Sequence, residues 1–161
     1  MIEKDFLNNL TIVIDSREQK PYTFPGYKTV VQGMSIGDYG LQNCTDIAVE
    51  RKNVDDLIGS LTKGRDRLQK ELQKGSHLPY FALVIEASLS DLANGNYQSS
   101  MLPNSAVQTL LSWSVKHNTH IFFCDNREYA EQITLSLLLK YGRMLYQKYN
   151  CWQKLIVNHI N

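Results

Sequence analysis

Carboxylate and ammonium side chains follow one another closely in the first third of the chain. Glu50, Arg51 and Lys52 end an apolar run, and Asp38 lies shortly before it in a predicted turn. If residues 47–52 form a strand, its period of two places Glu50 and Lys52 on one face, about 6.6 Å apart, and Arg51 on the other. A carboxylate and an ammonium group then share one side of a strand, where Asp38 can add a second carboxylate.

Two carboxylates that converge in a cleft favour a hard divalent cation. Mg²⁺ and Mn²⁺ prefer oxygen ligands and retain bound waters. Such an ion polarises a phosphoryl oxygen and lowers the pKa of a bound water, which is the chemistry of phosphodiester hydrolysis. Lys52 would place a cation beside the developing charge or orient the attacking water. The alternative is that Glu50 and Lys52 form only a salt bridge at a strand end.

The order of the motifs along the chain resembles the nuclease domain of the XPF family. The signature of that family is G-D, a variable gap and then E-R-K-x-x-x-D. Its two parts are filled here by Gly37-Asp38 and by the run from Glu50 to Asp56. The likeness also includes Ile14-Asp15-Ser16-Arg17-Glu18 and Lys63-Gly64-Arg65, and it covers roughly residues 10–141.

The resemblance implies a restriction-endonuclease-like, three-layer α/β/α fold and a DNA endonuclease that uses Mg²⁺ or Mn²⁺. The implied substrates are branched, flap or fork DNA structures, and the implied assembly is a homodimer. Asp38 and Glu50 match the metal ligands of the family, Lys52 its catalytic lysine, and Asp15 a supporting acidic residue beside the metal. Four further positions match residues that orient this centre or contact the phosphate backbone: Arg17, Glu18, Arg51 and Asp56.

Three of these residues also have simpler explanations. Asp56 lies in the first helical turn after Asn53, so it could serve only to cap a helix. Arg17 and Glu18 could pair with each other on a loop. The sequence leaves both alternatives open.

Positive charge concentrates in residues 63–74, although the formal net charge of the whole chain is only +1. A guanidinium near the metal centre would suit bidentate contact with phosphate. We therefore predict contacts with the DNA backbone for Arg65, Arg67, Lys70 and Lys74. The alternative is a solvated helix face, which such stretches often form.

Short β-rich runs alternate with helical periodicities, which predicts an α/β sandwich with a central mixed sheet. We expect strands at 10–14, 28–32, 46–50, 80–86 and 120–124. Helices are expected over 54–74, 105–117 and from 127 to about 149, because apolar residues recur there at helical steps. The predicted helix N-caps are Asn53, Asn104, and Asp125 or Asn126.

The 161 residues suffice for one domain, which we place at 1–149, with a C-terminal tail at 150–161. Family members commonly add a tandem helix-hairpin-helix DNA-binding domain, for which the residues after Tyr149 are too few. A partner protein could then supply specificity for DNA structure. Neither a secretory signal nor a membrane-spanning apolar segment is visible, and three cysteines form no C-x-x-C pair, so a cytoplasmic protein is expected.

Two other functions compete with an active structure-selective endonuclease. One is a catalytically silent DNA-binding or scaffold subunit, because this family often pairs an active chain with a degenerate one. The presence of Asp38, Glu50 and Lys52 favours activity. The other is a nuclease of the same fold that cuts duplex DNA at a specific sequence, but no recognition segment is visible.

The last predicted helix motivates the homodimer independently. Its apolar series consists of Tyr129, Ala130, Ile133, Leu137, Leu138, Tyr141, Met144 and Leu145. Leu135 and Leu139 fall off this stripe, which suggests a second apolar face for a partner. The alternative is that one monomer packs both faces.

Overall fold

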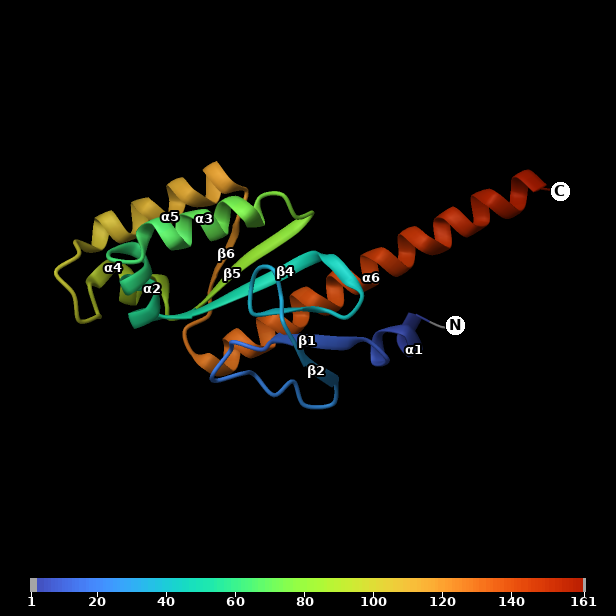
Figure 1. The fold of residues 1–161 in the computed structure, drawn as a ribbon, viewed down its shortest axis with the longest axis horizontal. Coiled ribbons are helices and arrows are strands. Elements are labelled where there is room, and N and C mark those ends of the chain that lie inside the picture. Colours follow the sequence, from blue (N-terminus) through green and yellow to red (C-terminus); the bar gives the residue numbers. More distant parts are fainter. Residues whose placement is uncertain (1–2, 161) are drawn as a thin grey trace.

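The structure, a computed structural model, describes residues 3–160 of the chain. Within these residues, one mixed six-stranded sheet has the order β2-β1-β3-β4-β5-β6 (Figure 1). The strands are β1 (Thr11–Asp15), β2 (Lys28–Gln32), β3 (Tyr39–Leu41), β4 (Cys44–Asn53), β5 (Tyr80–Glu86) and β6 (His120–Phe123). β4, β5 and β6 run parallel, whereas β3 is antiparallel to both of its neighbours, β1 and β4.

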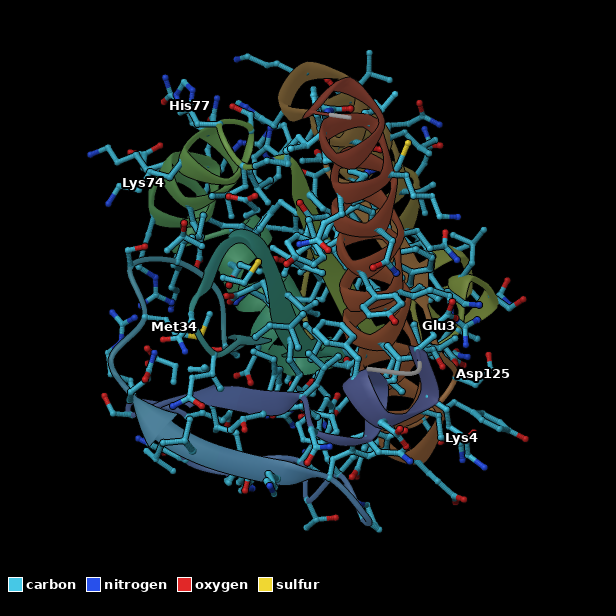
Figure 2. All side chains as sticks on the ribbon, turned by 90° about the vertical axis from the view of Figure 1, so that its right-hand side faces the viewer. Glu3, Lys4, Met34, Lys74, His77 and Asp125 are labelled. Atoms are coloured by element: carbon cyan, nitrogen blue, oxygen red, sulfur yellow. The ribbon has the colours of Figure 1, made fainter. Side chains whose placement is uncertain are left out.

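Helices cover both faces of this sheet. They are α1 (Glu3–Asn8), α2 (Val54–Leu61), α3 (Arg65–Gly75), α4 (Leu89–Asn94), α5 (Pro103–His117) and α6 (Arg127–Ile160). The buried side chains of β4 alternate between two cores. Ala48 packs with α2, α3 and α5 on one face, and Val49 packs with α6 on the other. Figure 2 shows this arrangement from the side, with α6 on one side of the sheet and α3, which carries Lys74, on the other. The α/β/α sandwich with a mixed sheet is confirmed.

The stretch 54–74 was predicted as one helix, and this prediction is wrong, because the chain turns between α2 and α3. The hydroxyl of Thr62 donates to the carbonyl of Ile58 at 2.8 Å, and the N–H of Gly64 donates to the carbonyl of Gly59 at 2.9 Å. A Cβ on Gly64 would lie 3.2 Å from the Cα of Ser60, so glycine permits the tight turn. The turn brings α3 to the border of the candidate site.

Two of the predicted helix caps are confirmed and one is wrong. Asn53 is the N-cap of α2, and the side chain of Asn126 accepts a hydrogen bond in the first turn of α6. Asn104 is not a cap, because α5 already begins at Pro103, and its N-cap residue Leu102 makes no side-chain cap bond. The short elements β3, α1 and α4 had no prediction.

α6 continues past residue 149, where its end was predicted. No change of secondary structure marks the predicted boundary between the domain and the tail. The helix covers the sheet until Tyr146, which stacks on Phe6 of α1 at 5.0 Å between ring centroids, and then projects from the body (Figure 1). Leu135, expected on a second apolar face, packs against the core on the α6 side of the sheet. No described helix is long and apolar enough to cross a membrane.

Candidate active site

The turn that carries Asp38 is held between two strands. Gly37 has a φ of +72°, and a Cβ on it would lie 3.0 Å from the Cβ of Ala48 and 3.1 Å from the carbonyl oxygen of Val49. The N–H of Asp38 donates to that carbonyl at 2.9 Å, and its own carbonyl accepts from the N–H of Asp15 at 2.8 Å. Glycine is required here by both conformation and space, and the turn fixes Asp38 beside β4.

The end of β4 presents the other motif residues as the strand period predicts. Lys52 Nζ lies 2.5 Å from Glu50 Oε1, so these two side chains share a face. The side chain of Arg51 reaches Glu86 on β5 instead, and its backbone N–H donates to Asp38 Oδ2 at 2.8 Å. A carboxylate pair and one lysine therefore converge at one strand end.

A hollow of about 1110 Å³ opens over this strand end and contains all three converging side chains. Its walls add the carboxylates of Asp15 and Glu71 and the cations of Arg17, Lys63 and Arg67. Acidic and basic side chains thus line it together, and the lining also includes Glu18, Lys20, Arg51, Asp55 and Asp56. Such a cleft can accept a negatively charged, extended ligand.

The carboxylates in the hollow repel one another. Burial and the charge of Glu50 raise the pKa of Asp38 to about 7. Burial, the charge of Glu50 and a hydrogen bond with it raise the pKa of Glu71 to about 8. Although burial opposes the ammonium form of Lys52, the charge of Glu50 and its hydrogen bond outweigh that cost and raise the lysine pKa. A further cation in the hollow would relieve this repulsion.

The donor set of Asp38 and Glu50 fits Mg²⁺ or Mn²⁺. Both are oxygen ligands, both border the hollow, and these ions complete their coordination with waters. Among the side chains that the structure describes, no group of three from the types His, Cys, Asp and Glu is gathered so that it could hold a metal. The protein would therefore supply two carboxylates, and solvent or the phosphate of a substrate would supply the remaining ligands.

Asp15, implied as a third acidic residue beside the metal, forms hydrogen bonds with Arg17 and Met34. Its carboxylate accepts from Nε and Nη2 of Arg17 at 2.7 and 3.1 Å and from the N–H of Met34 at 2.6 Å. Burial favours the neutral carboxyl, but the hydrogen bonds from Arg17 and Met34 lower the pKa of Asp15. The structure thus does not bring this carboxylate into the pair formed by Asp38 and Glu50.

Arg17 and Glu18 do not pair with each other, so that alternative is wrong. Arg17 binds Asp15 while its side chain stays 72% exposed at the rim of the hollow. Glu18 lies 3.5 Å from the guanidinium of Arg51 and is buried. Both residues border the hollow, Arg17 with an exposed side chain and Glu18 with a side chain that packs against Arg51.

Asp56 acts in helix capping, as the simpler explanation proposed. Its N–H donates to the side-chain oxygen of Asn53 at 2.8 Å, and its carboxylate accepts from the amide of Asn53 at 2.8 Å. The same carboxylate lies in the lining of the hollow. Capping and a role beside the site are thus compatible.

The four residues predicted to contact DNA separate into two groups. Arg67, Lys70 and Lys74 border a second hollow of about 330 Å³ beside the first, with Arg17, Arg67 and Glu71 common to both. Arg65 instead lies over the ring of Trp113, with its guanidinium carbon 4.9 Å from the ring centroid. Three of the four residues therefore form a cationic rim together with Arg17, and Arg65 lies outside this rim.

Two carboxylates of the site were missed by the sequence analysis. Glu71 lies between lysines on α3, where the sequence suggests only a solvated charge. Its helical step of four from Arg67 was the available signal that both face one side. Glu86 ends the apolar strand β5 and accepts hydrogen bonds from Arg51, which is distant in sequence. No local pattern reveals that contact.

A mixed sheet between helical layers, with carboxylates and a lysine at the end of a central strand, defines a restriction-endonuclease-like protein. The family model of the ERCC4 domain matches residues 14–137, which is most of the chain. The chain therefore belongs to the ERCC4 domain family. This match lies within the 10–141 region of the predicted resemblance.

Two solved structures have a similar fold. XPF from Aeropyrum pernix has a TM-score of 0.68 and 19% sequence identity, over 92% of this chain and 73% of that chain. XPF from the same organism in a complex with DNA has a TM-score of 0.60 and 17% identity, over 87% of this chain and 66% of that chain. A sequence search of curated proteins gives no match. The predicted XPF-type nuclease fold is confirmed.

Proposed function

We propose that the protein is a Mg²⁺- or Mn²⁺-dependent endonuclease that hydrolyses DNA phosphodiester bonds. The convergence of Asp38, Glu50 and Lys52 in one hollow carries this proposal. Two buried carboxylates with a single lysine between them are poorly matched in charge, and a divalent cation would complete the match. Membership of the ERCC4 domain family supports the same chemistry.

Each residue of the motif has a separate role in this proposal. Asp38 and Glu50 would hold the ion, which would supply Lewis acidity and lower the pKa of a water. The ammonium of Lys52 stabilises the negative charge that develops on the phosphoryl oxygens. Its salt bridge with Glu50 fixes the ammonium at the floor of the hollow, where a scissile phosphate would lie. Arg17, exposed at the rim, binds a neighbouring phosphate.

The cationic border formed by Arg17, Arg67, Lys70 and Lys74 supports DNA as the ligand. Spaced cations along a rim bind a phosphate backbone without reading its bases. One of the structurally similar XPF proteins was solved with DNA. Branched, flap or fork substrates follow from the family resemblance, since a nuclease of this type reads the shape of its DNA.

The test is cleavage of labelled flap, fork, duplex and single-stranded DNA with Mg²⁺ or Mn²⁺. We expect cleavage of at least one junction substrate, none in EDTA, and slower cleavage of plain duplex. Binding of DNA without cleavage under all conditions would contradict the proposal and favour a catalytically silent subunit. Cleavage of duplex DNA at one sequence would contradict the preference for structure.

A homodimer remains a prediction in this proposal, as does a partner that supplies DNA specificity. α6 exposes large side chains that a second copy could cover: Tyr129, Tyr149, Trp152 and Ile156 are between 52% and 65% exposed. A dimer mass by light scattering at micromolar concentration is the expected result. A monomer mass across that range would contradict it.

A further inference from the structure

Glu86, at the end of β5, is a buried carboxylate that accepts hydrogen bonds from three other side chains. Its side chain is 7% exposed. It accepts from Nε and Nη2 of Arg51 at 2.8 and 2.9 Å, from the hydroxyl of Tyr22 at 2.9 Å and from Nη1 of Arg127 at 3.2 Å. It thus joins β4, β5, α6 and the loop after β1 at one point.

The guanidinium of Arg51 is fully committed to this interior network. Nε and Nη2 bind Glu86, Nη1 lies 3.5 Å from Glu18, and the guanidinium carbon lies 5.7 Å from the ring centroid of Tyr22. The side chain is 9% exposed. Arg51 also borders the hollow, and these contacts hold its guanidinium and with it the end of β4.

The backbone of Arg51 transmits this constraint to the active site. Its N–H donates to Asp38 Oδ2, and the residues on either side of it are Glu50 and Lys52. A rotation of the strand at Arg51 would move both neighbouring side chains and remove a hydrogen bond from Asp38. Displacements of this kind lower the rate of the chemical step, because reacting groups must be held within a fraction of an ångström.

We propose that Glu86 is a positioning residue, which fixes Arg51 and through it the spacing of Asp38, Glu50 and Lys52. This inference rests on the proposed nuclease function. Glu86 touches no reacting group, and its effect passes through the end of β4. It is expected to change the rate of the chemical step and to leave the affinity for DNA intact.

Glu131 of α6 offers a matched control. Its carboxylate accepts from the N–H and hydroxyl of Thr23 and from the N–H of Phe24, at 2.7 to 3.1 Å. It therefore holds the same loop that Tyr22 ties to Glu86. It has no contact with Arg51 among its hydrogen bonds. Loss of Glu131 should loosen the loop without moving the end of β4.

The test compares Glu86→Gln with Glu131→Gln in single-turnover cleavage of DNA by the full chain. Removing an outer partner of an active site typically costs about 10- to 100-fold in activity, and we expect that loss for Glu86→Gln. We expect a loss below about threefold for Glu131→Gln, and a DNA Kd within about twofold of wild type for both, since neither residue meets the backbone. Equal losses in the two variants would overturn the proposal.

A neutral double variant separates positioning from stability. In Glu86→Gln, Arg51 keeps its ion pair with Glu18 while Arg127 loses its ion pair with Glu86, and this excess of positive charge should lower Tm. Glu86→Gln with Arg127→Gln removes one negative and one positive charge, so Tm should recover in part. The cleavage rate should stay low, because Arg51 still lacks its ion pair with Glu86. Recovery of the rate along with Tm would overturn the proposal.

A spectroscopic readout keeps this inference distinct from the nuclease proposal. The Nε–Hε resonance of Arg51 should be slow to exchange in the wild type and in Glu131→Gln, and lost or shifted in Glu86→Gln. If the wild-type chain cut no DNA, the proposed function would fail while the contact of Glu86 with Arg51 was still measured. An unchanged Arg51 resonance in Glu86→Gln would overturn the positioning role.

Discussion

Two groups of charged side chains lie at the same end of the sheet and differ in how their charges are matched. The first, which we call the cleft cluster, consists of three carboxylates that interact with one another, Asp38, Glu50 and Glu71, together with Lys52, which pairs with Glu50. The second, which we call the paired cluster, contains two carboxylates and two guanidinium groups: Glu18, Glu86, Arg51 and Arg127. Both meet at β4, whose alternating side chains enter one cluster or the other.

The shifted carboxylate pKa values are raised in the cleft cluster and lowered in the paired cluster. In the cleft cluster, burial and neighbouring negative charge raise the pKa of Asp38 to about 7 and that of Glu71 to about 8. In the paired cluster, burial would raise the pKa of Glu86, but its hydrogen bonds with Arg51 and Tyr22 lower it. The pKa of Arg51 is raised by its hydrogen bond with Glu86, despite burial.

The difference separates architecture from function. Opposite charges that pair closely, as Glu86 and Arg51 do, join the elements that carry them. Buried carboxylates without matching cations are costly to the free protein, and such groups are concentrated at sites that act on ligands. The paired cluster thus supports the site, and the cleft cluster is the site.

The largest expected effect comes from removing the single cation of the cleft cluster. Lys52→Met keeps the apolar stem and deletes the charge, so cleavage should fall by roughly a thousandfold or more as transition-state stabilisation is lost. Mn²⁺ should bind at least as tightly, since a repelling charge is gone. Single-turnover rates and calorimetry measure the two effects. Cleavage by this variant at the wild-type rate, or loss of its metal binding, would contradict separate roles for the two carboxylate ligands and for Lys52.

A smaller effect is expected from cations outside both clusters. Lys70→Gln with Lys74→Gln should weaken DNA binding about tenfold and reduce the salt slope by about two, because each phosphate contact releases a counterion. Lys148→Gln with Lys154→Gln, both near the C-terminal end of α6, removes the same charge and should change little.

Arg65→Gln provides a second control for the cationic rim, because Arg65 lies on Trp113. We expect its DNA affinity to stay within about twofold of wild type. Binding measured by fluorescence anisotropy at several salt concentrations tests all three variants. A loss of DNA affinity for Arg65→Gln equal to that of the Lys70 and Lys74 variant would support the contact of Arg65 with DNA that the sequence predicted.

The smallest effect is a pH dependence that differs between the clusters. Asp38 has a folded pKa of about 7 against an ordinary value of 3.8, so the folded state binds more protons between these values. Stability of the metal-free protein should therefore fall as pH rises from about 4 to about 7, with a loss of Tm on the order of 5 °C. The lowered pKa of Glu86 gives the opposite sign, with stability lost only as pH falls below its ordinary 4.5.

Thermal melts in EDTA at pH 5 to 8 measure this difference. Asp38→Asn should flatten the fall in Tm, while Glu86→Gln should leave its slope unchanged. Added Mn²⁺ should recover stability most at the upper end of the range, where both carboxylates are ionised. A Tm that rises from pH 5 to 8 in the metal-free wild type would contradict the account of the cleft cluster.

Sequence alone predicted the elements whose signals are local. The run at residues 80–86 is apolar up to its last residue and contains aromatic and β-branched side chains, and the strand there has the predicted bounds. The motif residues followed from the strand period, which sends Glu50 and Lys52 to one face. β3 has only three residues, and its place between β1 and β4 depends on pairing with distant segments, so no local pattern marks it.

Contacts between distant elements account for what the sequence could not reveal. The apolar steps of residues 54–74 continue across the turn at Gly64, so periodicity predicts one helix where packing produces two. The same packing carries Glu71 from a lysine-rich stretch to the side of Glu50. Asp15 was predicted beside the metal from the motif match alone, and its contacts with Arg17 and Met34 could not be read from the sequence.

One measurement tests the central claim most directly, namely that the unmatched carboxylates hold the ion needed for cleavage. It is the single-turnover rate of junction DNA cleavage in saturating Mn²⁺ by wild type, Glu50→Gln and Asp38→Asn. Each substitution keeps the side-chain volume and removes one charged oxygen ligand. We predict that both variants lose at least about a thousandfold in rate while DNA binding is retained. Cleavage by either variant at the wild-type rate would contradict the account.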